Sequence, residues 1–114
     1  HKDLYNIDKT LHYISANLGE QLTLNGLAGN AHVSPSYFSS MFKRYMGVSL
    51  FEYIARKRVE SACHLIDTSS MTFTEISSAC GFNNYTSFIT TFRKYVGCSP
   101  TEYRKSPNRS PQLF

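Results

Sequence analysis

The 114-residue sequence contains no tryptophan, four prolines and three cysteines. Cys63, Cys80 and Cys98 are odd in number and far apart, and no CxxC pair occurs. We therefore expect neither a disulfide framework nor a zinc site, and a reducing, cytoplasmic environment fits this cysteine usage. No apolar run approaches the ~20 residues of a membrane span, and no signal peptide opens the chain.

The sequence also lacks the motifs of common enzymes. It has no HExxH, no glycine-rich phosphate loop and no pair of carboxylates on one predicted helix face. Cys63 and His64 are adjacent in sequence, so they lie on different faces of a helix and do not suit a catalytic pair. We expect a protein that is not an enzyme and that needs no cofactor or metal.

The net charge of +4 favours an acidic partner. Nucleic acid is the first candidate and an anionic membrane the second. A modest positive balance is also common on solvated surfaces, so the positions of the charges must decide.

Apolar residues recur with helical spacing and never alternate as in a strand, which predicts an all-α fold. Leu4, Ile7, Leu11, Ile14 and Leu18 share one face of the first helix, and Gly19 ends it. Seven helices are predicted, at about 4–18, 24–31, 35–45, 50–66, 73–80, 84–95 and 100–105. They form a domain over 1–105, made of a lobe at about 1–48, a linker helix at about 49–66 and a second lobe at about 67–105. Residues 106–114 are predicted to be a flexible tail.

Helix starts are well marked. Ser34 is an expected N-cap followed by Pro35 at the first helical position. Capping boxes are expected where a hydroxyl precedes a glutamate by three residues, at Ser49 to Glu52, Thr72 to Glu75 and Ser99 to Glu102.

One segment occurs twice. Residues 42–53, FKRYMGVSLFEY, match residues 92–103, FRKYVGCSPTEY, at six positions, and lysine and arginine replace each other in the basic pair. Each copy includes the end of a helix that is itself preceded by another short helix. Two such helices joined by a turn are the helix-turn-helix arrangement. The two arrangements cover 23–45 and 72–95.

Both second helices combine a predicted apolar inner face with an outer face of small polar residues. The inner faces are Tyr37, Phe38, Met41, Phe42 and Tyr45 in the first, and Phe88, Thr91, Phe92 and Tyr95 in the second. A slim polar face suits entry into the DNA major groove, where hydroxyls can bond base edges and basic residues can meet phosphates. Candidate base contacts are Ser36, Ser39, Ser40, Tyr85, Thr86, Ile89 and Thr90, although Tyr85 could instead pack against its own lobe. Candidate phosphate contacts are Ser34, Lys43, Arg44, Asn83, Asn84, Arg93 and Lys94.

The linker helix provides a geometric argument. Successive major-groove faces on one side of DNA are about 34 Å apart. A rod of roughly 25 Å, together with the half-widths of the lobes, would separate two recognition helices by about that distance. We therefore expect one chain to read two adjacent groove segments.

The set of motifs resembles the AraC-type (arabinose regulator, AraC/XylS) transcription regulators from about Ile14 to Arg104. The matching residues are Leu27, Ala28, Ser34, Phe38, Phe42, Lys43, Gly47, Ser49, Tyr53, Arg58, Ala62, Glu75, Ile76, Gly81, Phe82, Phe88, Phe92, Gly97, Ser99, Pro100, Tyr103 and Arg104. The resemblance implies a seven-helix domain that binds bacterial promoter DNA through two helix-turn-helix units. It also implies RNA polymerase as a partner and a preceding sensor or receiver domain, in agreement with a first residue that is not methionine.

Some positions depart from that family. Ser77 stands where the family favours alanine, and Ser40 and Thr90 stand where members often have arginine. Without arginine at those positions, a bidentate guanine contact is not expected there. We therefore expect recognition through phosphates, hydroxyl bonds, a contact of Ile89 with a thymine methyl, and DNA shape.

Two other binding functions were considered. The hydroxyl faces could serve as docking surfaces of a helical protein-interaction module without DNA binding. RNA is a weaker alternative, since an A-form major groove does not admit these helices.

Overall fold

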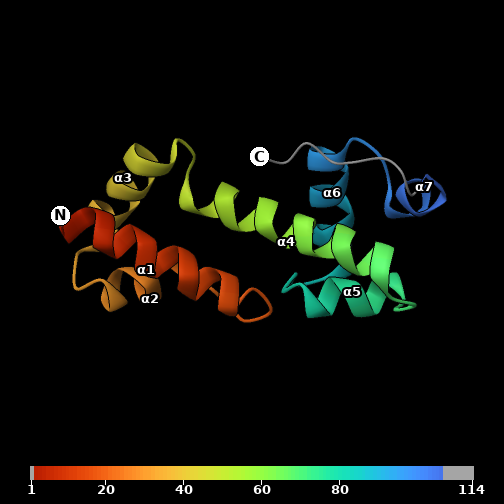
Figure 1. Cartoon of the computed structure of the whole chain (residues 1–114), viewed down its shortest axis with the longest axis horizontal. Coiled ribbons are helices and arrows are strands. Elements are labelled where there is room, and N and C mark those ends of the chain that lie inside the picture. The colour runs from red at the N-terminus through yellow and green to blue at the C-terminus, as the bar shows by residue number, and fades with distance from the viewer. Residues whose placement is uncertain (1, 107–114) are drawn as a thin grey trace. The chain divides into compact units, whose positions relative to one another are not determined.

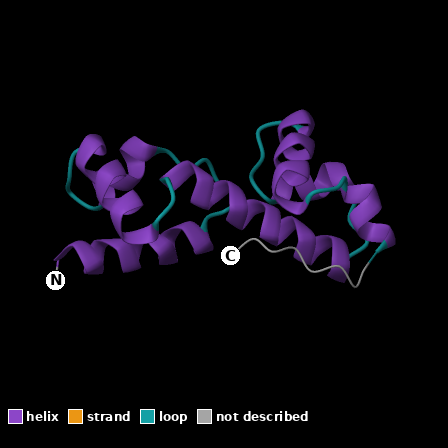
Figure 2. Cartoon of the chain, turned by 90° about the horizontal axis from the view of Figure 1, so that it is seen from above, coloured by secondary structure: helices purple, strands orange, loops and turns teal. Residues whose placement is uncertain are grey.

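The computed structural model describes residues 2–106, and this part of the chain contains helices and loops and no strand (Figure 2). The all-α prediction is confirmed. The helices are α1 (Lys2–Ala16), α2 (Leu24–Asn30), α3 (Pro35–Met46), α4 (Leu50–Thr68), α5 (Phe73–Ala79), α6 (Tyr85–Val96) and α7 (Pro100–Lys105) (Figure 1). Apart from Ser106, the predicted flexible tail lies outside the described residues. No helix in 2–106 is both long and apolar enough to cross a membrane.

The chain divides into two compact units between Ile54 and Ala55, inside α4. We call the part up to Ile54 unit 1 and the part from Ala55 unit 2. Each unit has its own hydrophobic core and contains one of the two predicted helix-turn-helix arrangements.

The core of unit 1 is formed by α1, α2, α3 and the start of α4. Its buried residues are Ile7, Ile14, Leu27, Ala28, Ala31, Phe38, Met41, Phe42, Leu50 and Ile54. The predicted inner face of α1 is wrong at Leu4, which is 55% exposed, whereas Asn6 and Thr10 are buried. Thr10 can be buried because its hydroxyl donates a 2.8 Å hydrogen bond to the Asn6 carbonyl, which satisfies both groups within the helix.

The core of unit 2 is formed by α4, α5, α6 and α7. Its buried residues are Val59, Ala62, Cys63, Ile66, Ile76, Cys80, Phe88, Phe92, Cys98 and Tyr103. The duplicated segments supply equivalent aromatic pairs to the two cores. Phe42 and Tyr53 meet edge to face at 5.5 Å in unit 1, and Phe92 and Tyr103 do so at 5.8 Å in unit 2.

The predicted caps determine where the helices begin. The Ser34 side chain accepts from the backbone of Tyr37 at 3.1 Å, and the Ser49 side chain accepts from that of Glu52 at 3.2 Å. Thr72 with Glu75 and Ser99 with Glu102 form complete capping boxes. These bonds satisfy backbone donors that have no partner inside the helix.

Candidate nucleic-acid interface

Helix α3 presents a narrow polar face to solvent. Ser36, Ser39, Ser40, Lys43 and Arg44 are all exposed, whereas Phe38, Met41 and Phe42 on the opposite side are buried. Gly47 ends the helix in a left-handed conformation with φ of 79°, which a residue without a Cβ adopts at little cost. The outward positions predicted for this helix are therefore at its surface.

Two residues predicted to face inward do not do so. Tyr37 is 45% exposed and Tyr45 is 38% exposed. Phe38, Met41 and Phe42 already form the buried face at helical spacing, and both tyrosines lie on its flanks. The Tyr45 ring instead lies under the Arg44 guanidinium, 5.4 Å from the ring centroid.

Helix α6 repeats this design in unit 2. The side chain of its N-cap, Asn84, accepts a 2.7 Å hydrogen bond from the backbone of Ser87, and Gly97 ends the helix with φ of 93°. Among the predicted contact residues, Asn83, Asn84, Tyr85, Thr86, Thr90, Arg93 and Lys94 are exposed.

The remaining candidate of α6, Ile89, is half-buried and packs against the core of unit 2. Only part of its side chain is left for the predicted thymine contact. The sequence left open whether Tyr85 faces DNA or packs against its own lobe. The side chain is 43% exposed, and its ring also packs against the lobe, 5.9 Å from that of Phe88.

The turns that lead into α3 and α6 have the same hydrogen bonds. Val33 donates to the carbonyl of Ala28 in unit 1, and Phe82 donates to that of Ser77 in unit 2, both at 3.1 Å. Ser77 is buried, so its hydroxymethyl group fits the place where the family favours alanine. The matching bonds give both helix pairs the same turn.

The basic pairs occupy the last turns of their helices, Lys43 and Arg44 in α3 and Arg93 and Lys94 in α6. All four side chains are exposed. Positive charge at this end complements the negative end of the helix dipole, and it also provides charges that could meet DNA phosphates.

An acidic residue that sequence reasoning missed reaches the surface of α3. The Asp3 carboxylate accepts a 2.8 Å hydrogen bond from the Tyr37 hydroxyl and lies 3.4 Å from Arg44 Nη2. The hydrogen bond to Asp3 is the main cause that raises the pKa of Tyr37. Asp3 and Arg44 are 41 residues apart, and neither periodicity nor spacing relates them.

Comparison with known proteins agrees with this arrangement. A family model described as a helix-turn-helix domain matches residues 27–106. The chain is 40% identical over 94 residues to YobQ of Bacillus subtilis, described as an uncharacterized HTH-type transcriptional regulator; the match covers 82% of this chain and 39% of YobQ. The chain belongs to the AraC-type family of transcription regulators.

Solved structures of the family share the fold. A Chromobacterium violaceum regulator with an AraC-type DNA-binding domain superposes with a TM-score of 0.84 at 25% identity, covering 93% of this chain and 95% of that one. The DNA-binding domain of AdpA, a global transcriptional factor solved with a target DNA, also gives 0.84, at 27% identity and coverages of 88% and 90%. This AraC-type chain is a DNA-binding domain of a transcription regulator.

The curated relatives are longer than this chain. It spans 39% of the length of YobQ and a similar share of other matched regulators.

Proposed function

We propose that α3 and α6 are the two DNA-reading helices of this domain and that they enter adjacent major-groove segments of a bacterial promoter. The observation that supports this proposal is the repeated design of the two helices. Each has an N-cap, exposed hydroxyls along its first turns, a basic pair in its last turn and a left-handed glycine at its end.

In this proposal, hydroxyl side chains bond base edges and basic side chains bond phosphates. Ser36, Ser39 and Ser40 act from α3, and Thr86 and Thr90 act from α6, where Tyr85 and the exposed part of Ile89 add contacts. Lys43, Arg44, Arg93 and Lys94 contact phosphates, and Ser34, Asn83 and Asn84 do so at the helix starts, where backbone N–H groups also favour phosphate.

The proposal for the whole protein is broader. Longer relatives are described as HTH-type transcriptional regulators. Their extra length supports a preceding sensor or receiver domain, and their described role supports RNA polymerase as a partner and action in the cytoplasm. The alternative is a helical protein-interaction module that uses the same hydroxyl faces and does not bind DNA.

Salt-dependent DNA binding tests the main proposal. A bound sequence is first selected from random duplex DNA, and affinity is then titrated against salt concentration. We expect Lys43→Ala and Arg93→Ala each to weaken all sequences about equally and to reduce the slope of log K against log salt by about one. No duplex binding at low salt would favour the interaction module.

The control is Lys105→Ala, which removes an exposed positive charge from α7. Its salt slope should stay at the value of the parent domain. Because Lys43 and Arg93 also stabilise their helix ends, thermal unfolding of each variant should show that the domain is folded at the temperature of the titration. Equal slopes for all variants would contradict the phosphate assignment.

A randomised operator library tests the base contacts. Replacing Ser36, Ser39 and Ser40 together by alanine should alter base preference at a few adjacent positions and leave the salt slope unchanged. A dominant guanine preference under either helix would contradict recognition through hydroxyls and shape.

A further inference from the structure

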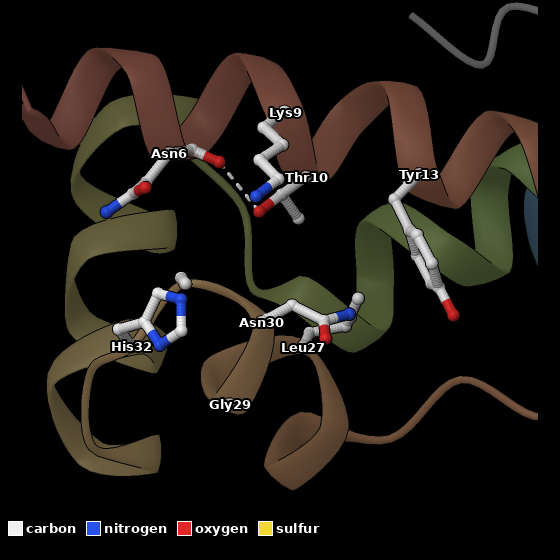
Figure 3. A pocket seen from close by; sticks show the side chains of 9 residues that line it. Asn6, Lys9, Thr10, Tyr13, Leu27, Gly29, Asn30 and His32 are labelled. Carbon is white, nitrogen blue, oxygen red and sulfur yellow. Dashed lines mark hydrogen bonds between the residues drawn. The ribbon is translucent and has the colours of Figure 1, made fainter.

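Unit 1 contains a cavity on the side of α1 that faces the end of α2 and the turn before α3 (Figure 3). Its volume is about 420 Å³, within the range of sites that hold small molecules. The lining residues are Asn6, Lys9, Thr10, Tyr13, Leu27, Gly29, Asn30, Ala31 and His32. We call it the α1–α2 cavity. None of the residues proposed to contact DNA lines it.

The wall contains an amide with an unsatisfied donor. Asn6 is 7% exposed, and its Nδ2 has no hydrogen-bond partner among the described residues. A buried donor without an acceptor is unfavourable. The terminal torsion of asparagine is broad and roughly two-fold, so a half-turn can present Nδ2 to the cavity, where an acceptor would satisfy it.

The other polar groups of the cavity are also rich in donors. Lys9 and Tyr13 extend from α1 toward the side of α2, and Asn30 and His32 lie across from them (Figure 3). No acidic residue lines the cavity, and no described carboxylate pairs with Lys9. One lysine beside amide, hydroxyl and imidazole groups favours a ligand with a single negative charge and several acceptor positions.

The remaining wall is apolar. The buried Leu27 and Ala31 side chains and the ring of Tyr13 offer a surface for a hydrocarbon group. A site of this kind suits a ligand with a charged head and an apolar body of a few carbon atoms.

We propose that the α1–α2 cavity binds a small organic carboxylate. Lys9 pairs with the carboxylate, the amides of Asn6 and Asn30 donate to its oxygens, and the hydrocarbon part packs on Leu27 and Tyr13. This binding requires no DNA, so it can be tested separately from the proposed function.

The probe is cyclohexanecarboxylate, titrated into the isotopically labelled 114-residue chain at constant ionic strength and followed by NMR. We expect saturable shifts of the Asn6 side-chain amide and of the backbone amides of Gly29 and His32. The uncharged cyclohexanecarboxamide has the same apolar body and should bind roughly tenfold more weakly, since it cannot pair with Lys9. Inorganic phosphate, which lacks that body, should also bind more weakly.

Two variants identify the residues involved. Lys9→Gln should weaken cyclohexanecarboxylate binding roughly tenfold. Asn6→Asp places a negative charge in the cavity wall and should abolish binding. Lys2→Gln is the matched control, because it removes an exposed lysine from the same helix but not from the cavity, and binding should be unchanged.

Several results would overturn the proposal. Shifts that do not saturate, or that spread over all basic surfaces, would mean that no site exists. Equal binding of the carboxamide or of phosphate would remove the carboxylate specificity. If the parent chain binds no carboxylate and Lys9→Gln reduces the slope of log K for DNA against log salt by about one, Lys9 is a phosphate contact instead.

Discussion

The two helix-turn-helix units carry the same basic pair at the same place but surround it differently. In unit 1, Asp3 lies 3.4 Å from Arg44 and accepts a hydrogen bond from Tyr37. In unit 2, neither Arg93 nor Lys94, the counterpart of Arg44, has an acidic partner among residues 2–106, and serine 87 stands where unit 1 has Tyr37. A phosphate that binds Arg44 must therefore compete with a carboxylate, whereas one that binds Lys94 need not. The two units share the helix design but not its electrostatic surroundings.

The turns differ in a second way. The residue in the left-handed conformation is His32, with φ of 60°, in unit 1 and Gly81, with φ of 91°, in unit 2. A residue with a Cβ pays for this conformation in steric energy, whereas glycine adopts it freely but loses more chain entropy on folding. The two units therefore form the same turn at different costs: steric strain at His32 in unit 1 and a larger loss of chain entropy at Gly81 in unit 2.

The largest expected effect on stability comes from truncating a core phenylalanine, and it tests whether the cores of the two units unfold independently. Phe42→Ala and Phe92→Ala each delete a fully buried ring that meets a tyrosine edge to face. Each should cost about 3–5 kcal/mol of unfolding free energy. Amide hydrogen exchange should show protection lost mainly in unit 1 for Phe42→Ala and mainly in unit 2 for Phe92→Ala. Equal losses in both units for either variant would mean that the units unfold together.

The two turns should respond by different amounts to substitution. Gly81→Ala forces a Cβ into the left-handed region and should destabilise the chain by about 1–2 kcal/mol in urea unfolding. His32→Gly removes that strain but adds unfolded-state entropy, so stability should change by less than about 1 kcal/mol. A large loss in His32→Gly would show that the imidazole makes a stabilising contact.

Removal of the carboxylate near α3 should make the two basic pairs more alike. Asp3→Asn frees Arg44 and should strengthen DNA binding about two- to fivefold at low salt, the range expected for an ion pair at the surface with one exposed partner. Asp8→Asn is the control, because it removes the same charge from an exposed position on α1. Fluorescence anisotropy with labelled duplex measures both. Weaker binding of Asp3→Asn would mean that Asp3 positions Tyr37 and Arg44 for DNA.

The smallest effect is a difference in acid sensitivity between α2 and α5. Hydrogen bonds from Thr72 lower the pKa of Glu75 in the capping box of α5 below its ordinary value of 4.5. Stability from this box is therefore complete above that ordinary value and is lost as the pH falls through the folded pKa. In α2, glycine 26 replaces the glutamate, so the Thr23 cap has no such dependence.

NMR between about pH 6 and about pH 3 measures this difference. The first-turn amides of α5 should shift and lose protection on acidification more than those of α2. Glu75→Gln keeps a side-chain acceptor that does not titrate and should remove the difference. If α5 in this variant still responds to acid, another group is responsible.

The sequence contained the local information on this fold. Hydroxyl caps, proline at first helical positions and the glycines after α3 and α6 marked helix starts and ends, because these residues satisfy backbone groups or free the backbone locally. The first helix differs from its prediction: α1 ends at Ala16, three residues before Gly19. The outer face of α3 could also be predicted, because helical spacing is likewise a property of the local sequence. The edges of the buried faces did not: Leu4, Tyr37 and Tyr45 are exposed because packing against other helices determines how wide a buried face becomes.

Long-range polar contacts were outside the reach of pattern analysis. The Asp3–Arg44 pair joins two helices whose register is set only by tertiary packing. The unsatisfied amide of Asn6 depends on how closely neighbouring side chains approach it. The half-burial of Ile89 depends in the same way on the width of the core of unit 2.

All three cysteines of the chain lie in unit 2, and all are free and buried. Burial raises the pKa of Cys63 to about 11, so a thiol reagent reacts appreciably only after the site opens. Because unit 1 contains no cysteine, the labelling rate of the protein reports the opening of unit 2 alone. Cys63 lies in α4, Cys80 caps α5 and Cys98 precedes α7. A common labelling rate would identify one cooperative opening, and three different rates would order the steps by which unit 2 comes apart.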